Sequence, residues 1–212
     1  MREILGLLLV DDHAVVREGY RRLLERRSDL RIVGEAGNAA DGYRLYKECG
    51  PDVAILDLSL PDMGGIELIK RLIQRDPQAR ILAFSMHRDP LFATQALRAG
   101  ALGYVTKSSS PEILIQAVYQ VAARQRVLSP DIAPDMALTL LDGAADPFRD
   151  LTPREFEVLR LVLDGHNAEE IGEALHISPK TAQNIHYQVK AKLGVRTDIE
   201  LMRLALRQNL VQ

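Results

Sequence analysis

Three carboxylates, two hydroxyls and one ammonium group stand at or just beyond the ends of short apolar runs in the first part of the sequence. In chain order they are Asp11, Asp12, Asp57, Ser85, Thr106 and Lys107. Carboxylates that gather in one place repel one another, so some must stay protonated or a cation must lie among them. Mg²⁺, a hard divalent ion that prefers oxygen ligands, suits such acids. We therefore expect a magnesium site where the fold brings these residues together.

The lysine indicates that an anion also visits this place, because an ammonium group neutralises phosphate oxygens. A phosphoryl group on one carboxylate would fit, with Asp57 as the nucleophile and Ser85 as a hydrogen-bond donor. The turn and the two glycines at 61–65 would then clear space above Asp57. Taken singly, each residue has a plainer role as a helix cap, a turn former or a solvated charge. Only their joint placement favours a site.

In residues 1–125, short apolar runs alternate with segments of helical spacing, and these elements must bring the six residues together. Short apolar runs lie at 4–10, 30–33, 53–58, 81–84 and 102–105, and segments with helical spacing lie at 13–27, 39–48, 65–75, 90–99 and 111–124. Five strand–helix units in a row predict an α/β domain, a (βα)5 arrangement whose parallel five-stranded sheet is covered by helices on both faces. Such sheets bind ligands beyond the carboxyl ends of their strands, where all six side chains are expected.

Two further regions follow this predicted domain. Prolines and a glycine punctuate residues 126–148, which we interpret as a linker with one short helix over the apolar stretch 136–141. Residues 149–212 show only helical spacing, and Thr152 with Glu155 has the form of a capping box. We expect an all-α domain of four helices there.

The helix predicted from Ser178 to Leu193 has two contrasting faces. Its apolar face consists of Ala182, Ile185, Val189 and Leu193, and its opposite face carries Lys180, Gln183, Asn184, Tyr187 and Gln188. Asn and Gln amides can pair with adenine edges, and lysine can meet phosphate. Residues 174–197 hold four lysine and arginine side chains and no acid. With the helix at 167–175 they indicate a DNA-reading helix-turn-helix, although a plain four-helix bundle with a solvated face is the alternative.

Four stretches, LVDDHAVVREG, ILDLSLPDMGGIEL, FSMH and GYVTK, resemble the receiver domain of two-component response regulators over residues 4–124. The resemblance implies a flavodoxin-like fold in which Asp57 accepts a phosphoryl group from a histidine kinase. The implied magnesium ligands are Asp11, Asp12, Asp57 and the backbone of Ser59. The implied phosphate-sensing residues are Ser85, Lys107 and a switch aromatic, Tyr104. Ser59 and His87 are expected to tune the lifetime of the phosphate.

The second domain resembles LuxR-type DNA-binding domains over residues 151–210, in the stretches LTPRE, IG, SPKT and KLGV. Together the two parts resemble a NarL/FixJ-type transcriptional regulator, in which phosphorylation shifts dimerisation and DNA binding. The residues expected to meet DNA are Lys180, Thr181, Gln183, Asn184, Tyr187, Gln188, Lys190 and Lys192. The expected partners are a histidine kinase, double-stranded DNA and, in the active state, a second copy of the chain.

Two positions depart from the common form of these families. Ser108 stands where many receivers have proline after the lysine. Because a cis peptide before a residue other than proline costs roughly 3 kcal/mol, the isomer of the Lys107–Ser108 bond cannot be assumed. Gln183 stands where the recognition helix usually has lysine. Losing this cation should weaken the attraction to phosphate by about one counterion, and an unusual target sequence is expected.

The composition bounds the class of protein. A chain that is 47% hydrophobic and 26% charged suits a soluble globular protein with a core, and a net charge of −2 gives no general attraction to polyanions. The single cysteine, Cys49, excludes an internal disulfide. The run 4–10 is too short to span a membrane and meets two acids, unlike a signal peptide. A cytoplasmic protein with no membrane partner is expected.

Two other functions remain open. One is a small hydrolase that uses Asp57, although only His87 stands where such an enzyme would need an acid–base histidine. The other is a regulator that acts without phosphorylation or binds a protein rather than DNA, and the intact acids with Lys107 argue against its first half. We therefore expect a regulator and not an enzyme. In the last helix, Leu201, Leu204 and Ala205 form either core or a pairing face.

Overall fold

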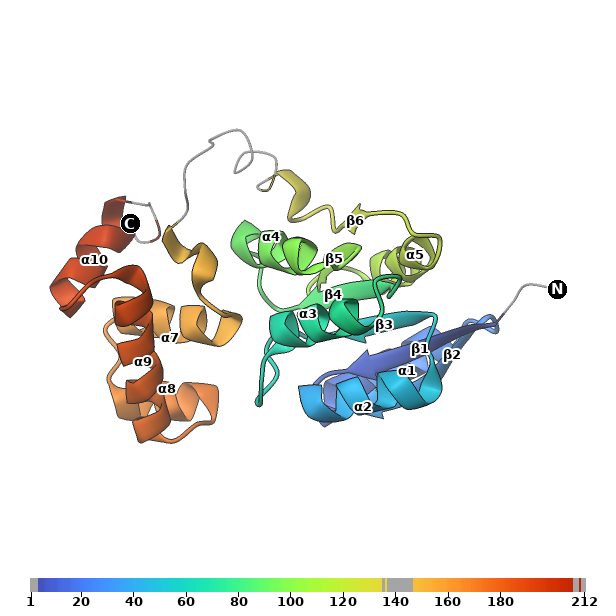
Figure 1. The fold of residues 1–212 in the computed structure, drawn as a ribbon, viewed down its shortest axis with the longest axis horizontal. Helices are drawn as coiled ribbons and strands as arrows, with labels where there is room; N and C mark the ends of the chain where they lie inside the picture. Colours follow the sequence, from blue (N-terminus) through green and yellow to red (C-terminus); the bar gives the residue numbers. More distant parts are fainter. Residues whose placement is uncertain (1–3, 135, 137–146, 208–209, 211–212) are drawn as a thin grey trace. The chain divides into compact units, whose positions relative to one another are not determined.

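The computed structural model describes residues 4–134, 136, 147–207 and 210. The chain forms two compact units, Met1–Gly143 and Ala144–Gln212, the first built on a sheet and the second from helices (Figure 1). Most of the stretch expected to be the linker helix, residues 137–141, lies outside the described residues. No helix in the described ranges combines the length and the apolar composition needed to cross a membrane.

A six-stranded sheet forms the centre of the first unit. Side by side, its strands are β2 (Leu30–Ala36), β1 (Leu5–Val10), β3 (Val53–Leu56), β4 (Ile81–Ser85), β5 (Gly103–Thr106) and β6 (Val127–Leu128). Among the described residues of this unit, the helices with defined bounds are α1 (Ala14–Glu25), α2 (Ala39–Cys49), α3 (Gly65–Arg75), α4 (Pro90–Ala99) and α5 (Pro111–Ala122), and residues 133, 134 and 136 are also helical. Every pairing is parallel, so the carboxyl ends of all strands meet at one edge.

The sheet has one strand more than the five that the sequence predicts. The extra strand, β6, lies in the segment interpreted as the linker: the amide of Val127 donates to the carbonyl of Leu102 at 3.1 Å, and that of Ser129 to Tyr104 at 3.0 Å. The outer edge of β5 carries backbone groups that need partners, and β6 supplies them. A strand of two residues is too short for its apolar alternation to be recognised in the sequence.

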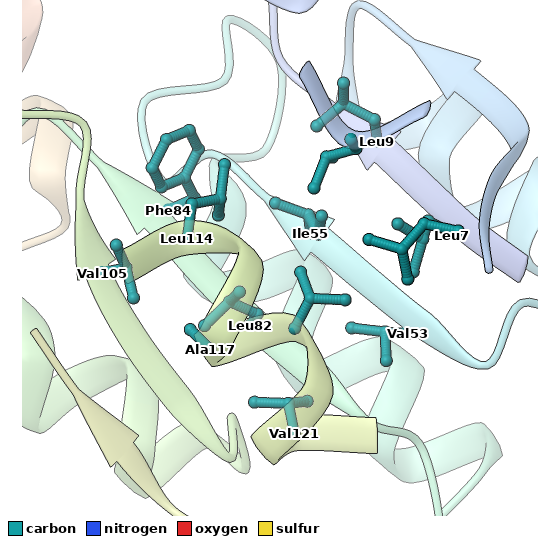
Figure 2. Close-up of a cluster of buried hydrophobic side chains, with 13 residues drawn as sticks. Leu7, Leu9, Val53, Ile55, Leu82, Phe84, Val105, Leu114, Ala117 and Val121 are labelled. Atoms are coloured by element: carbon teal, nitrogen blue, oxygen red, sulfur yellow. The ribbon is translucent and has the colours of Figure 1, made fainter. Parts of the chain in front are cut away.

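Alternate strand residues face two different helix layers, which explains why the strands are continuous apolar runs. On the face covered by α5, side chains of strands β1 to β5 pack with those of α5 and with Leu24 of α1 in one buried cluster (Figure 2). On the other face, α2 lies so close to β1 that a Cβ at Gly42 would stand 3.0 Å from the side chain of Val10. The buried strands hold their carboxyl ends rigidly in place.

The second unit has the four helices that the sequence predicts, preceded by one short 3-10 helix. They are η1 (Pro147–Asp150), α7 (Pro153–Leu163), α8 (Ala168–Leu175), α9 (Pro179–Leu193) and α10 (Asp198–Arg207). The capping box of Thr152 and Glu155 begins α7, and a second box begins α8. A small core of Val158, Ile171 and Ala182 joins α7, α8 and α9.

Candidate functional site

Asp57 stands directly beyond the carboxyl end of β3, as the sequence predicts. Its amide donates to the carbonyl of Val10 at 2.8 Å, which continues the pairing of β3 with β1 by one residue. Its carboxylate accepts a hydrogen bond of 3.1 Å from the amide of Ser59. Asp57 is only 3% exposed, so the chain places a carboxylate at the very end of a buried strand.

The two glycines after Asp57 allow the chain to turn back against it. Gly64 has φ +74°, in the left-handed region that L side chains rarely adopt, and a Cβ at Gly65 would lie 2.1 Å from the carbonyl oxygen of Asp57. The side chain of Asp62 ties the same turn to α2, because its carboxylate accepts from the amides of Ala39 and Ala40 at 2.9 and 2.8 Å. The sequence indicated a turn here but not the role of Asp62.

Lys107 joins two of the acids. Its Nζ lies 2.6 Å from Oδ2 of Asp57 and 2.7 Å from Oδ2 of Asp11, and the three side chains are 5%, 3% and 1% exposed. Burial raises the pKa of the Asp57 carboxyl above its ordinary value, although Lys107 acts in the opposite direction. Burial also acts to lower the pKa of Lys107, but attraction to Asp57 and Asp11 outweighs it, and the pKa lies above its usual value.

The acids also fit a divalent cation. Ligand atoms of Asp11, Asp12, His13 and Asp57 all lie within 4.8 Å of one another. Three of the four residues offer carboxylate oxygens, the ligands that Mg²⁺ prefers. The imidazole of His13 lies 2.7 Å from a carboxylate oxygen of Asp12. Asp11, Asp12 and Asp57 are therefore the side chains that could hold Mg²⁺, and ligation by the backbone of Ser59 stays a prediction.

Ser85 and Tyr104 lie on the two strands beside this group. Ser85 is buried at the end of β4, and its carbonyl accepts from the amide of Lys107 at 2.7 Å. Tyr104 is completely buried, where the sequence allowed a half-buried aromatic, and its hydroxyl donates to the carbonyl of His87 at 2.8 Å. Burial raises the pKa of Tyr104 well above its ordinary value, while a hydrogen bond with Ser85 acts in the opposite direction.

Ser59 and His87 contact each other directly. Ser59 Oγ and His87 Nε2 lie 3.0 Å apart, and the His87 ring packs on Phe92 of α4 with ring centroids 4.3 Å apart. The sequence named both residues but gave no sign of this contact, because 28 positions separate them. The contact links the turn after Asp57 to the loop after Ser85.

Thr106 does not join the acids, although the sequence placed it at the same edge. Its hydroxyl contacts the hydroxyls of Ser108 and Ser109 and donates to the carboxylate of Asp131. No peptide bond of the described chain is cis, so the Lys107–Ser108 bond is trans.

Helix α9 presents the two faces that the sequence predicts. Ala182 and Val189 are buried in the second unit, and Ile185 and Leu193 are half-buried. The predicted DNA-contacting side chains Lys180, Thr181, Gln183, Asn184, Tyr187 and Gln188 are exposed. In the last helix, Leu201 and Ala205 are completely buried and therefore belong to the core, whereas Leu204 is half-buried.

Two of the predicted DNA contacts pair with acids of their own domain. Lys190 Nζ donates to Asp198 at 3.0 Å, next to a 2.8 Å contact between His186 and the same carboxylate. Lys192 Nζ donates to Glu155 at 2.7 Å, which joins the end of α9 to the capping box of α7. Both cations therefore already have an acid partner within the domain.

Comparison with protein families covers both units. Residues 7–119 match the family described as response regulator receiver domain, and residues 149–205 match the bacterial regulatory proteins of the luxR family. The response regulator UvrY of Escherichia coli is 33% identical over 209 residues, which are 98% of this chain and 96% of that protein.

Solved structures agree with this assignment. A LuxR-family two-component response regulator from Aurantimonas matches 66% of this chain and 99% of its own, with 50% identity and a TM-score of 0.64. RcsB from Salmonella enterica, bound to a promoter in the presence of the phosphomimetic BeF3⁻, matches 94% of this chain and 97% of its own, with 28% identity and a TM-score of 0.61. The chain therefore belongs to the response regulators that join a receiver domain to a LuxR-type DNA-binding domain.

Proposed function

We propose that Asp57 accepts a phosphoryl group from the phosphohistidine of a histidine kinase, in a step that requires Mg²⁺. A carboxylate oxygen of Asp57 forms the new bond to phosphorus as the bond between phosphorus and the histidine nitrogen breaks, and the imidazole leaves with that electron pair. The observation that supports this role is the convergence of Asp11, Asp57 and Lys107 at the carboxyl edge of the sheet.

The chain's own residues divide the work of this transfer. Bound Mg²⁺ would offset the charge of the acids and of the incoming phosphoryl oxygens. Lys107 keeps one cation within 3 Å of the reacting carboxylate and meets a phosphoryl oxygen after transfer. The raised pKa of Lys107 keeps it charged at neutral pH. Ser85 ends β4, the strand that pairs with β3, and its hydroxyl would donate a hydrogen bond to the new group.

Phosphorylation then changes dimerisation and the binding of DNA by α9. The exposed amides of its outer face suit base edges, and the exposed Lys180 suits phosphate. RcsB was solved bound to a promoter in the presence of a phosphomimetic, and this similarity supports a link between phosphorylation and DNA binding here. Because Lys190 and Lys192 are engaged in ion pairs, the face around Asn184 and Gln188 carries the direct contacts.

Ser59 and His87 tune how long the phosphate stays. Their side chains meet 3.0 Å apart, beside the carboxylate whose Oδ1 accepts from the amide of Ser59. A water that attacks the phosphoryl group must approach past this pair. Replacing His87 with alanine opens that approach, and the lifetime of the phosphorylated protein should change. An unchanged lifetime would contradict this role.

The proposed transfer can be tested on the full chain with acetyl phosphate as the donor. We expect a phosphoryl adduct on Asp57 by mass spectrometry in the presence of Mg²⁺, its loss with EDTA, and its absence in Asp57→Asn. Fluorescence anisotropy with DNA from the protein's own upstream region should show tighter binding after phosphorylation. Finding no adduct at Asp57 under any of these conditions would refute the proposal, whereas an adduct without tighter DNA binding would refute only the second step.

A further inference from the structure

A chain of hydrogen bonds leads from the loop after β4 to the segment that follows β6. Arg88 Nε donates to Ser108 Oγ at 3.0 Å, and Ser108 Oγ lies 3.1 Å from Thr106 Oγ1. Thr106 Oγ1 in turn donates to Asp131 Oδ2 at 2.5 Å. The middle members, Thr106 and Ser108, are the two neighbours of Lys107 in the sequence. This series of hydrogen bonds therefore includes the residues on both sides of the lysine that pairs with Asp57.

The direction of these bonds follows from the donors that each group has. A guanidinium can only donate and an ionised carboxylate can only accept, so the chain begins at Arg88 and ends at Asp131. Each hydroxyl has one proton to pass on, so Ser108 donates to Thr106. Partial burial acts to raise the pKa of Asp131, but hydrogen bonds from Thr106, Ser129 and Ser109 outweigh it and hold the pKa below its ordinary value. The carboxylate is therefore ionised at neutral pH, and bonds that all point one way strengthen one another.

Backbone contacts seat the same segment on β5. The amide of Thr106 donates to Ser129 Oγ at 3.3 Å, and the amide of Ser129 donates to the carbonyl of Tyr104 at 3.0 Å. Ile132 donates to the carbonyl of Ser129 at 3.1 Å and is completely buried. The start of the chain that leaves the receiver is therefore packed against the strand that carries Tyr104 and leads into Lys107.

The series of hydrogen bonds depends on Ser108, which stands where many receivers have proline. A proline at position 108 would offer no hydroxyl, and the link between Arg88 and Thr106 would be lost. Asp131 could then hold Thr106, but it would reach the loop after β4 only through its longer, 3.9 Å ion pair with Arg88. The departure from proline that the sequence shows has a structural consequence.

We propose that Asp131 is a positioning residue: it holds the loop of Lys107 and makes the segment 127–134 respond to the occupancy of Asp57. This inference rests on the proposed function, because it requires that Asp57 be modified. Phosphorylation of Asp57 gives an acyl phosphate, which removes one of the two carboxylate charges that Lys107 now neutralises and brings phosphoryl oxygens towards which the ammonium turns, while Asp11 remains its other partner. Its neighbours Thr106 and Ser108 carry that movement to Asp131, and Asp131 carries it into the segment that leads to the second unit.

Amide hydrogen exchange on the full chain tests this proposal, with Mg²⁺ and beryllofluoride as the probe that imitates a phosphoryl group. In the wild type, the probe should alter exchange in peptides covering 57–60, 106–109 and 127–134. In Asp131→Asn, exchange in 127–134 should be about tenfold faster without the probe, which corresponds to roughly 1.4 kcal/mol, and should no longer respond to it. Peptides 57–60 and 106–109 should still respond.

Two further variants separate positioning from a general loss of stability. Ser108→Ala breaks the chain one bond earlier and should weaken the response of 127–134 while Asp131 remains. Asp52→Asn is the matched control, because the Asp52 carboxylate also accepts a hydrogen bond, from the amide of Gly6 at 2.7 Å, but precedes β3 and so lies at the opposite edge of the sheet. Its response to the probe should equal that of the wild type.

The outcomes distinguish this inference from the proposed function. A response of 127–134 that survives in both Asp131→Asn and Ser108→Ala would overturn the inference. So would a wild type in which 57–60 responds to the probe and 127–134 does not, and the proposed function would then stand. A wild type in which 57–60 does not respond would overturn both.

Discussion

The acid site of the receiver and the outer face of α9 carry function in opposite ways. At the acid site, Asp11, Asp57 and Lys107 are almost completely withdrawn from water, and each has its partner within the same domain. On α9, Gln183 and Asn184 point into solvent. Buried charges must satisfy one another, whereas exposed amides are satisfied by water until a ligand replaces it. The interactions of the acid site are therefore already formed in the unliganded fold, whereas the side-chain amides of α9 have no partner among the described residues that would reveal their ligand.

This difference predicts unequal costs of substitution, and Lys107→Met should give the largest. Removing the ammonium leaves two buried carboxylates without a cation, and the free energy of unfolding at pH 7 should fall by about 3–5 kcal/mol. Mg²⁺ should restore part of this loss. Urea denaturation with and without Mg²⁺ measures both effects, and Lys70→Met, on an exposed position of α3, serves as the control.

The same variant has a pH dependence whose sign follows from the loss of Lys107. In the wild type Lys107 lowers the pKa of Asp57 against the effect of burial, so its removal raises that pKa further. A group whose pKa is raised in the folded state contributes stability at low pH and loses it as pH rises. The deficit of Lys107→Met should therefore shrink between pH 7 and pH 5. A deficit that grows towards acid pH would contradict the account of the site.

The next largest effect is expected at the turn behind Asp57. Gly65→Ala places a Cβ 2.1 Å from a backbone oxygen, so the strand end or the turn must shift, at a cost of roughly 1–3 kcal/mol. Gly19→Ala is the matched control: its Cβ meets nothing within 4 Å, and in α1 alanine should stabilise by about 0.5–1 kcal/mol. Thermal unfolding followed by circular dichroism gives both values, and equal effects of the two variants would exclude the close approach at Asp57.

The two regions also differ in how far the sequence predicts them. The apolar runs and the positions of Asp57 and Lys107 follow from the spacing alone, because the carboxyl ends of parallel strands share one edge. The half-buried pair of Ser59 and His87 could not be predicted, since a contact across 28 positions depends on how two loops fold. Asp131 lay in the segment interpreted as linker, and the two-residue strand β6 that anchors that segment has no sequence signal.

On α9 the sequence predicts which face is exposed but not which cations are free. The periodicity places Lys180 and Lys190 alike in the basic stretch, yet only the structure shows Lys190 paired with Asp198. Asp198 begins the next helix, eight positions away, so no local spacing announces the pair. Long-range ion pairs of this kind decide which charges remain for a ligand.

Whether the outer face of α9 meets DNA can be tested by restoring at position 183 the lysine that the family usually has. Gln183→Lys should strengthen non-specific DNA binding and make the dependence of log K on log salt steeper by about one ion. The stability of the second unit should not change, because Gln183 is exposed. Anisotropy titrations at several salt concentrations measure the slope. Glu169→Gln, on α8, is the control, because it raises the net charge by the same amount at another exposed position. An unchanged slope would mean that position 183 does not face DNA.

The smallest effect is expected from breaking the ion pair between Lys190 and Asp198. Asp198→Asn removes the acid that pairs with Lys190, while Thr197, whose hydroxyl accepts a hydrogen bond from the amide of Glu200, still caps α10. An exposed ion pair contributes at most about 1 kcal/mol, so stability should change little. Lys190 would then be free to meet phosphate, and DNA binding at low salt should strengthen with a slope steeper by less than about one ion. The double variant Asp198→Asn with Lys190→Met should lose this gain. If the double variant still binds DNA more tightly than the wild type, the gain does not come from Lys190. The ion pair with Asp198 then does not limit how strongly α9 attracts DNA.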